Sequence, residues 1–239
     1  MLVEKARFIP RNPRQVYPRD GGMTIKVILA DDAQIVRQGL RTRLAGEPDI
    51  QVVGEADDGR KTLKLAQELA PDVIIMDISM PDLNGFEATR QLLVGSPGAK
   101  VIALSLHSDS LFVSNMLRSG ALGYLLKDCA LEELVEAIRT VMRQQTYISP
   151  GVSDLLIQDL ASNCAAGSSS AYSVLSAPER EVLQLLAEGK GTLQIAASLG
   201  LSSKTIESHH KQIVSKLGLS SVAELTKYAI RQGLASLDE

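Results

Sequence analysis

Five polar side chains suited to phosphoryl transfer each follow or close a short apolar run. Asp31 and Asp32 follow the first run, and Asp77, Ser105 and Lys127 close three later ones. Three neighbouring carboxylates repel one another unless a cation lies between them, and Mg²⁺ prefers such oxygen ligands. A carboxylate beside Mg²⁺ can attack a phosphoryl group, while a hydroxyl and an ammonium neutralise the transferred oxygens. This chemistry requires a fold that brings all five together.

Taken singly, these residues also have purely structural explanations. Asp31 or Asp32 can cap a following helix, Asp77 can be a strand-end carboxylate in a turn, and Lys127 can be a solvated surface lysine. Their joint placement at the ends of four apolar runs favours the phosphoryl site.

The apolar runs predict the elements that would position these side chains. Most of the runs are continuous, as in strands buried on both faces of a parallel sheet, and the segments between them have the spacing of amphipathic helices. The pattern predicts an α/β domain with a doubly wound, five-stranded parallel sheet of flavodoxin-like order. Ligands bind at the carboxyl ends of such strands, where the five side chains would meet. The expected strands are 25–30, 52–56, 73–77, 100–105 and 123–127.

The C-terminal part of the chain has a different, all-helical pattern. A small domain of four helices is predicted, with glycines just past three of the helix ends, where left-handed backbone is common. The helices are expected at Ala177–Glu188, Leu193–Leu199, Ser203–Leu217 and Ser221–Gln232.

Composition completes the predicted organisation of the 239 residues. Residues 1–22 are rich in Pro and Arg and predict a disordered basic arm, 23–147 form the α/β domain, 148–175 form a serine-rich linker, and 176–239 form the helical domain. No apolar run approaches the ~20 residues that span a bilayer, and no signal peptide is apparent. We therefore expect a cytoplasmic protein that makes no membrane contact.

The motifs around the first site resemble those of receiver domains of two-component response regulators. The resembling text is ILADD, IIMDISMPDLNGFE, IALSLH and GYLLKD, within roughly residues 24–145. The resemblance implies that Asp77 is the phosphorylated aspartate. It further implies that Asp32, Asp77 and the backbone carbonyl of Ser79 bind Mg²⁺ directly, and that Asp31 acts mainly through water.

The same resemblance assigns roles around the phosphoryl group. Ser105 and Lys127 would hold its oxygens. Tyr124 occupies the position of the family's switch aromatic and would turn inward when Ser105 moves toward the phosphoryl group. A histidine kinase is the implied phosphodonor.

The helical part resembles the LuxR-type helix-turn-helix of the NarL/FixJ family in LSAPEREVLQLLAEGK, QIAASLGLSSKTIESHHKQIVSKLGL and AELTKYAIRQG. Residues 203–217 would be the recognition helix in the major groove, and the last helix would contribute to dimerisation. Candidate DNA contacts are Glu207, Ser208 and Lys211 for bases and Lys204, Thr205 and Lys216 for phosphates.

These features predict a transcriptional regulator and not an enzyme: a kinase would phosphorylate Asp77, and a homodimer would then bind double-stranded promoter DNA. We also hypothesise that the two domains dock before phosphorylation and separate on activation. A haloacid-dehalogenase-type phosphatase would need an acid/base Asp where Ser79 stands, and a flavin carrier would need a hydroxyl- and Gly-rich loop after the first strand. An interaction adaptor stays open, because residues 172–239 have seven acidic and seven basic residues.

Overall fold

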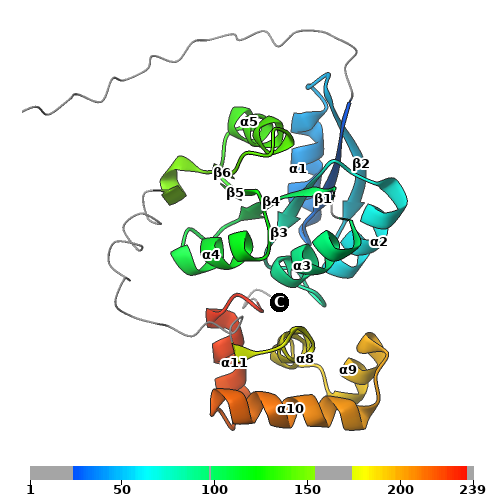
Figure 1. Cartoon of the computed structure of the whole chain (residues 1–239), viewed down its shortest axis with the longest axis vertical. Coiled ribbons are helices and arrows are strands. Elements are labelled where there is room, and N and C mark those ends of the chain that lie inside the picture. Colours follow the sequence, from blue (N-terminus) through cyan, green and yellow to red (C-terminus); the bar gives the residue numbers. More distant parts are fainter. Residues whose placement is uncertain (1–23, 97, 154–173, 236–239) are drawn as a thin grey trace, which may run out of the picture.

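The structure is a computed structural model that describes residues 24–96, 98–153 and 174–235, which form two domains in contact (Figure 1). The expected basic arm and most of the expected linker lie outside the described residues.

The larger domain is built on a parallel sheet with strand order β2-β1-β3-β4-β5-β6, so the predicted flavodoxin-like core is confirmed. A short sixth strand was not predicted, because two residues are too few to show a pattern. It pairs with β5 at the sheet edge. The strands are β1 (Ile25–Ala30), β2 (Ile50–Ala56), β3 (Val73–Asp77), β4 (Lys100–Ser105), β5 (Gly123–Leu126) and β6 (Tyr147–Ile148).

The residues that follow β6 pack back onto this domain. The Ser149 amide donates to the carbonyl of Tyr124 at 2.9 Å, and Val152 is fully buried in the core. Residues 148–153, expected at the start of the linker, thus lie against the sheet.

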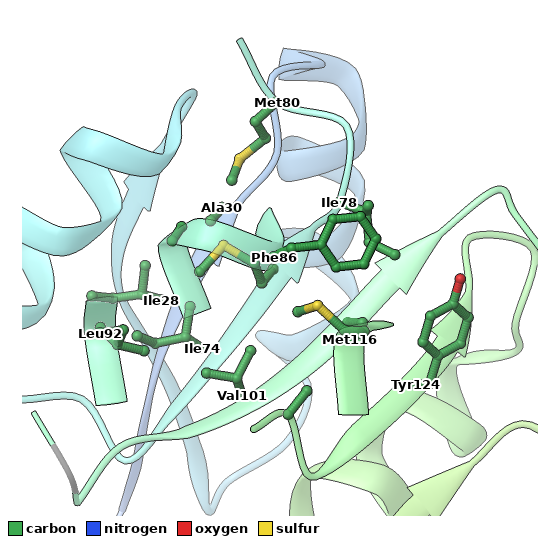
Figure 2. Packing of buried hydrophobic residues seen from close by; sticks show 14 of the residues in the cluster. Ile28, Ala30, Ile74, Ile78, Met80, Phe86, Leu92, Val101, Met116 and Tyr124 are labelled. Atoms are coloured by element: carbon green, nitrogen blue, oxygen red, sulfur yellow. The ribbon is translucent and has the colours of Figure 1, made fainter. Parts of the chain in front are cut away.

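Helices cover both faces of the sheet, as a doubly wound fold requires (Figure 1). Helices α1 (Gln34–Leu44) and α5 (Leu131–Met142) enclose one apolar cluster with one face. Helices α2 (Gly59–Leu69), α3 (Gly85–Gly95) and α4 (Ser110–Arg118) enclose the other. Figure 2 shows that second cluster, which includes Phe86, Met116 and Tyr124.

Strand register brings the predicted site residues to one edge of the sheet. Met76 pairs with Ala30 of β1, and Asp77 pairs with Leu104 of β4. Ser105 in turn pairs with Leu126 of β5. Asp77 therefore lies between the ends of β1 and β4, with the end of β5 one strand further.

The smaller domain consists of α8 (Ala177–Ala187), α9 (Thr192–Leu199), α10 (Ser203–Leu217) and α11 (Val222–Arg231), as predicted within one or two residues. Its own core includes Val182, Ile206 and Ile213. Gly200 ends α9 with a φ of 65°, a left-handed conformation that turns the chain into α10. Helix α8 faces the larger domain, whereas α10 lies on the far side (Figure 1).

Candidate functional site

Three carboxylates and one ammonium meet at the carboxyl edge of the sheet. Asp31, Asp32 and Asp77 each place a carboxylate oxygen within 4.8 Å of the others. The Lys127 Nζ lies 2.8 Å from Asp31 Oδ2 and 3.1 Å from Asp77 Oδ2. Asp31 and Asp77 are buried, whereas Asp32 is exposed at the mouth of the cluster.

Backbone amides fix the two buried carboxylates. Asp77 Oδ1 accepts from the Ile78 amide at 2.8 Å, and Asp31 Oδ1 accepts from the Ala33 amide at 3.0 Å. The Oδ2 atom of each therefore faces Lys127, so the oxygens of the cluster are oriented by the chain itself.

Burial and mutual charge set the protonation of this cluster. Burial raises the pKa of Asp77 from 3.8 to about 6; Lys127 opposes this and Asp31 adds to it. Burial also raises the pKa of Asp31 against the influence of Lys127. Burial alone would lower the pKa of Lys127, but the two aspartates outweigh it and raise that pKa. One lysine thus does not neutralise three carboxylates, and the cluster is short of positive charge.

The donor set fits a hard divalent cation. Asp31 Oδ2 is buried, and its partner among the described residues is the Lys127 ammonium. Carboxylate oxygens grouped this closely, with one exposed, match the ligands and the open side that Mg²⁺ favours. The three aspartates therefore form a cluster consistent with a site for a divalent cation.

Ser105 and Tyr124 lie in one hydrogen-bonded chain beside Asp77. Ser105 Oγ accepts from the His107 amide at 3.0 Å, and the Tyr124 hydroxyl donates to the His107 carbonyl at 2.7 Å. Tyr124 is fully buried, and this burial raises its pKa to about 12. Its role as the switch residue stays a prediction. The His107 ring stacks on Phe112 with centroids 4.1 Å apart.

The acceptor cluster opens into a cavity of about 500 Å³ that both domains line. Ser79 contributes to its wall beside Asp77. From the smaller domain, Ile230 and Ala235 complete the wall. The end of α11 thus borders the mouth of the site.

The predicted DNA-contacting residues lie on α10, away from the larger domain. Lys204, Glu207, Ser208 and Lys211 are exposed. The remaining two candidates have partners within the domain: Thr205 Oγ1 lies 2.8 Å from Ser202 Oγ, and the Lys216 Nζ lies 2.6 Å from Glu179 Oε2.

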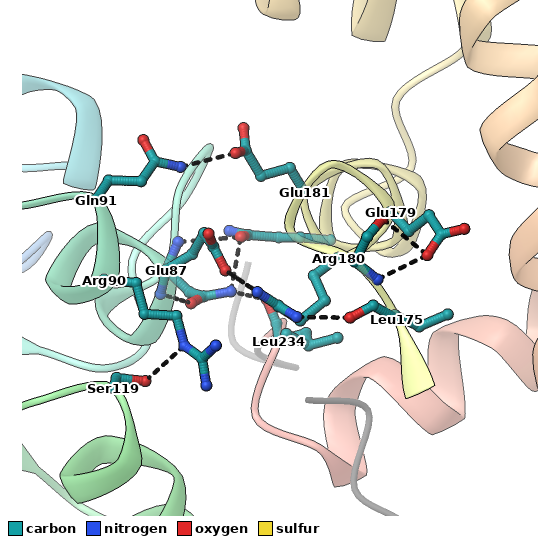
Figure 3. A network of polar contacts seen from close by, with 12 residues as sticks. Glu87, Arg90, Gln91, Ser119, Leu175, Glu179, Arg180, Glu181 and Leu234 are labelled. Atoms are coloured by element: carbon teal, nitrogen blue, oxygen red, sulfur yellow. Dashed lines mark hydrogen bonds and ion pairs between the residues drawn. The ribbon is translucent and has the colours of Figure 1, made fainter. Parts of the chain in front are cut away.

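Sequence reasoning did not place the contact between the domains. Arg180 of α8 forms a buried ion pair with Glu87 of α3 at 2.8 Å and also donates to the Leu175 carbonyl (Figure 3). Glu181 accepts from Gln91 at 2.8 Å in the same network. The sequence shows polar residues at every fourth position, Arg180, Gln184 and Glu188, which places them on one helix face. A helix face exposed to solvent has the same pattern, so the pattern alone does not predict a contact between domains.

Glycine allows a close approach at the other end of this contact. Gly233 has a φ of 71°, and a Cβ there would lie 2.6 Å from Phe112 Cε1 and 3.0 Å from Phe86 Cε2. The chain after α11 therefore packs directly on two aromatic rings of the larger domain.

Comparison with known proteins accounts for both domains. Residues 27–139 match the response regulator receiver domain, and residues 173–229 match the bacterial regulatory proteins of the luxR family. The oxygen regulatory protein NreC of Staphylococcus carnosus is 37% identical, over 88% of this chain and 99% of its own. The response regulator GacA of Pseudomonas syringae is 39% identical, over 88% of this chain and 97% of its own.

Solved structures agree with these relatives. The RcsB response regulator of Salmonella typhimurium is 30% identical with a TM-score of 0.61, over 87% of this chain and 98% of its own. A second RcsB structure, bound to promoter rprA with the phosphomimetic BeF₃⁻, has a TM-score of 0.58 at 30% identity, over 86% and 98%. The chain therefore belongs to the two-component response regulators with a receiver and a LuxR-type helix-turn-helix domain, the NarL/FixJ family of transcription regulators and not of enzymes.

Proposed function

We propose that this regulator accepts a phosphoryl group on Asp77 and binds promoter DNA as a dimer through α10. The observation that supports the acceptor role most directly is the buried Asp77 carboxylate between Asp31, Asp32 and Lys127. A carboxylate with both a cation site and an ammonium beside it is arranged to react with a phosphoryl group.

Phosphoryl transfer would proceed in line from the phosphohistidine of a kinase. An Asp77 oxygen attacks phosphorus, the P–N bond breaks, and the histidine nitrogen leaves with the bonding electron pair, which gives an acyl phosphate and a free histidine. Asp77 Oδ2 faces the Lys127 ammonium, which would neutralise the new oxygens. Ser105, at the end of the neighbouring strand β4, would donate its hydroxyl to them.

Mg²⁺ would be held by Asp32, Asp77 and the Ser79 carbonyl, with Asp31 acting through water. When bound, it would neutralise charge on the transferred oxygens. The grouping of three carboxylates with one exposed member supports this assignment.

The DNA-binding role rests on the exposed face of α10 and on the relatives. Solved RcsB structures are described as dimers bound to DNA and as bound to a promoter. In this chain, Glu207, Ser208 and Lys211 are exposed and would contact bases, while Lys204 and Thr205 would contact phosphates. Lys216 is exposed and would also contact a phosphate, in competition with its ion pair to Glu179.

Activation would couple the two sites through domain separation. Docking engages the end of α11, the helix that the resemblance assigns to dimerisation, whereas α10 is open. Separation of the domains would free α11 for a second copy. Phosphorylation would shift the equilibrium between docked and separated domains toward the separated state. A histidine kinase as phosphodonor and promoter DNA as target both support a cytoplasmic location.

Phosphorylation is tested by intact mass after incubation with Mg²⁺ and acetyl phosphate. One added phosphoryl group is expected on the wild type and none on Asp77→Asn. Equal labelling of both proteins would contradict the acceptor assignment.

DNA binding is tested by the dependence of affinity on salt. Affinity for promoter DNA is expected to fall steeply with salt, and Lys204→Ala is expected to reduce the log–log slope by about one because one phosphate contact is lost. Binding without salt dependence, or no binding, would support an adaptor instead.

A further inference from the structure

The loop that follows Asp77 is bonded to the helix-turn-helix domain at alternate residues. Met80, Asp82 and Asn84 each form a hydrogen bond with α8 or with the residue that caps its C-terminus. Their partners are Gln184 of α8 and Glu188, the C-cap residue of that helix, which are about one helical turn apart. The loop beside the acceptor is therefore supported by a domain that is distant in sequence.

Gln184 makes the central contacts of this support. Its Oε1 accepts from the Asn84 amide at 3.0 Å and from Asn84 Nδ2 at 2.9 Å. Its Nε2 donates to the Met80 carbonyl at 3.1 Å and to Glu188 Oε1 at 2.8 Å. Both Gln184 and Asn84 are buried, so loss of this amide would leave buried backbone groups of the loop without partners.

The loop is held in a conformation that benefits from such support. Asp82 has a φ of 62°, a left-handed conformation that costs an aspartate about 1 kcal/mol. Its amide donates to Glu188 Oε1 at 3.2 Å, and its carboxylate pairs with Lys190. Asn84 is also the N-cap of α3, where its Oδ1 accepts from the Glu87 amide. Both halves of the loop are thus anchored from the smaller domain.

We infer that Gln184 is a positioning residue for the metal site of the receiver, because it holds Met80 and Asn84 on either side of the loop that presents the Ser79 carbonyl. The Ser79 carbonyl belongs to the peptide group that joins Ser79 to Met80. Movement of Met80 would therefore displace the Ser79 carbonyl relative to the Asp77 carboxylate. The inference rests on the proposed metal site. It adds that the helix-turn-helix domain supplies part of the scaffold of that site.

Thermodynamic reciprocity gives this arrangement a second consequence. If docking improves the metal site, then metal binding strengthens docking by the same factor. The coupling is local, since it passes through one side chain and two hydrogen-bonded peptides.

The test uses Mn²⁺ as a paramagnetic probe of the cation site in the full chain, with free Mn²⁺ measured by electron paramagnetic resonance. Gln184→Met, which keeps the length of the side chain and removes its amide, is expected to raise the Kd about fivefold. Gln212→Met, at an exposed position of α10, is the matched control and should leave the Kd unchanged. Hydrogen exchange of the peptide covering 78–86 should accelerate in Gln184→Met alone.

Four outcomes would overturn the inference, and they are distinguishable. No Mn²⁺ binding by the wild type, or undiminished binding by Asp32→Asn, would refute the proposed metal site and the inference with it. A wild-type Kd in Gln184→Met, while Asp32→Asn loses binding, would refute the role of Gln184 alone. Glu181→Ala weakens docking away from the loop, and a loss of affinity equal to that of Gln184→Met would assign the effect to docking as a whole and not to this amide.

Discussion

Replacing Asp77 by Asn is expected to stabilise the receiver when no divalent cation is present. The Asp77 carboxylate is buried, and its pKa rises from 3.8 to about 6 in the folded protein. The folded state therefore keeps this proton to a higher pH than the unfolded chain does. Ionisation in the folded state costs stability, and a neutral amide of the same shape avoids that cost.

The pKa difference fixes the size and the pH range of the effect. A rise from 3.8 to about 6 corresponds to about 3 kcal/mol at neutral pH. Below pH 3.8 both states are protonated and the cost is absent; it grows between the two values and is constant above about pH 6. Asp77→Asn should thus gain about 3 kcal/mol at pH 7.5 and little near pH 4.

Calorimetric unfolding in EDTA measures this directly. The transition of the receiver is expected about 10 °C higher in Asp77→Asn than in the wild type at pH 7.5, with the gap closing toward pH 4. Excess Mg²⁺ should reduce or reverse the gap, because a cation bound by Asp77 favours the ionised carboxylate. A variant that is less stable than the wild type in EDTA at pH 7.5, or a gap independent of pH, would refute this reasoning.

Three further substitutions test the contact between the domains and the DNA surface. Gly233→Ala places a Cβ 2.6 Å from Phe112 Cε1 and should separate the domains, which small-angle X-ray scattering would report as a larger radius of gyration. Arg180→Ala leaves the Glu87 carboxylate buried without its cation, a cost of about 3–5 kcal/mol that domain separation relieves, so limited proteolysis between the domains should accelerate. Lys211→Ala should weaken promoter binding by about 1–3 kcal/mol in gel-shift titrations and relax preference at one base pair.

The two substitutions at the contact between the domains each have a control in the smaller domain. Gly189 has a φ of 79° with nothing within 4 Å of a Cβ, so Gly189→Ala has a similar backbone strain without the steric contact. Lys227→Ala removes an exposed cation of α11 and should leave proteolysis unchanged. A radius of gyration that rises equally in both glycine variants would contradict the contact at Phe112, and unchanged promoter affinity in Lys211→Ala would exclude that side chain from the interface.

The acceptor cluster could be predicted because strand ends have a local signature. The continuous apolar run at 73–77 ends in Asp77. The alternation of apolar runs with amphipathic segments predicts parallel strands, so the carboxyl end of β1 is expected at the same edge of the sheet as Asp77, as the pairing of β1 with β3 confirms. Strand β6 could not be predicted in this way, because Tyr147 and Ile148 form a strand only through pairing with β5.

The interface between the domains has no comparable signature. Arg180 and Gln184 are buried only because Glu87 and Asn84 lie opposite them, and a polar helix stripe looks the same in sequence whether its partner is water or another domain. The ion pair between Lys216 and Glu179 was also not predicted, because the two residues are far apart in sequence and meet only in the folded domain. Long-range pairings of this kind depend on the assembled fold.

The opposite placement of α8 and α10 has a consequence for how such regulators diverge. The residues expected to choose the operator, Glu207 and Lys211, belong to α10, whereas Gln184 belongs to α8. Helix α8 faces the larger domain, and α10 lies on the far side of the small domain (Figure 1). Substitutions on α10 that change the DNA sequence bound can therefore accumulate without altering the surface of α8 that contacts the receiver. Input and output specificity are separable in this chain, and a graft of α10 from a relative should redirect binding while leaving the response to the kinase intact.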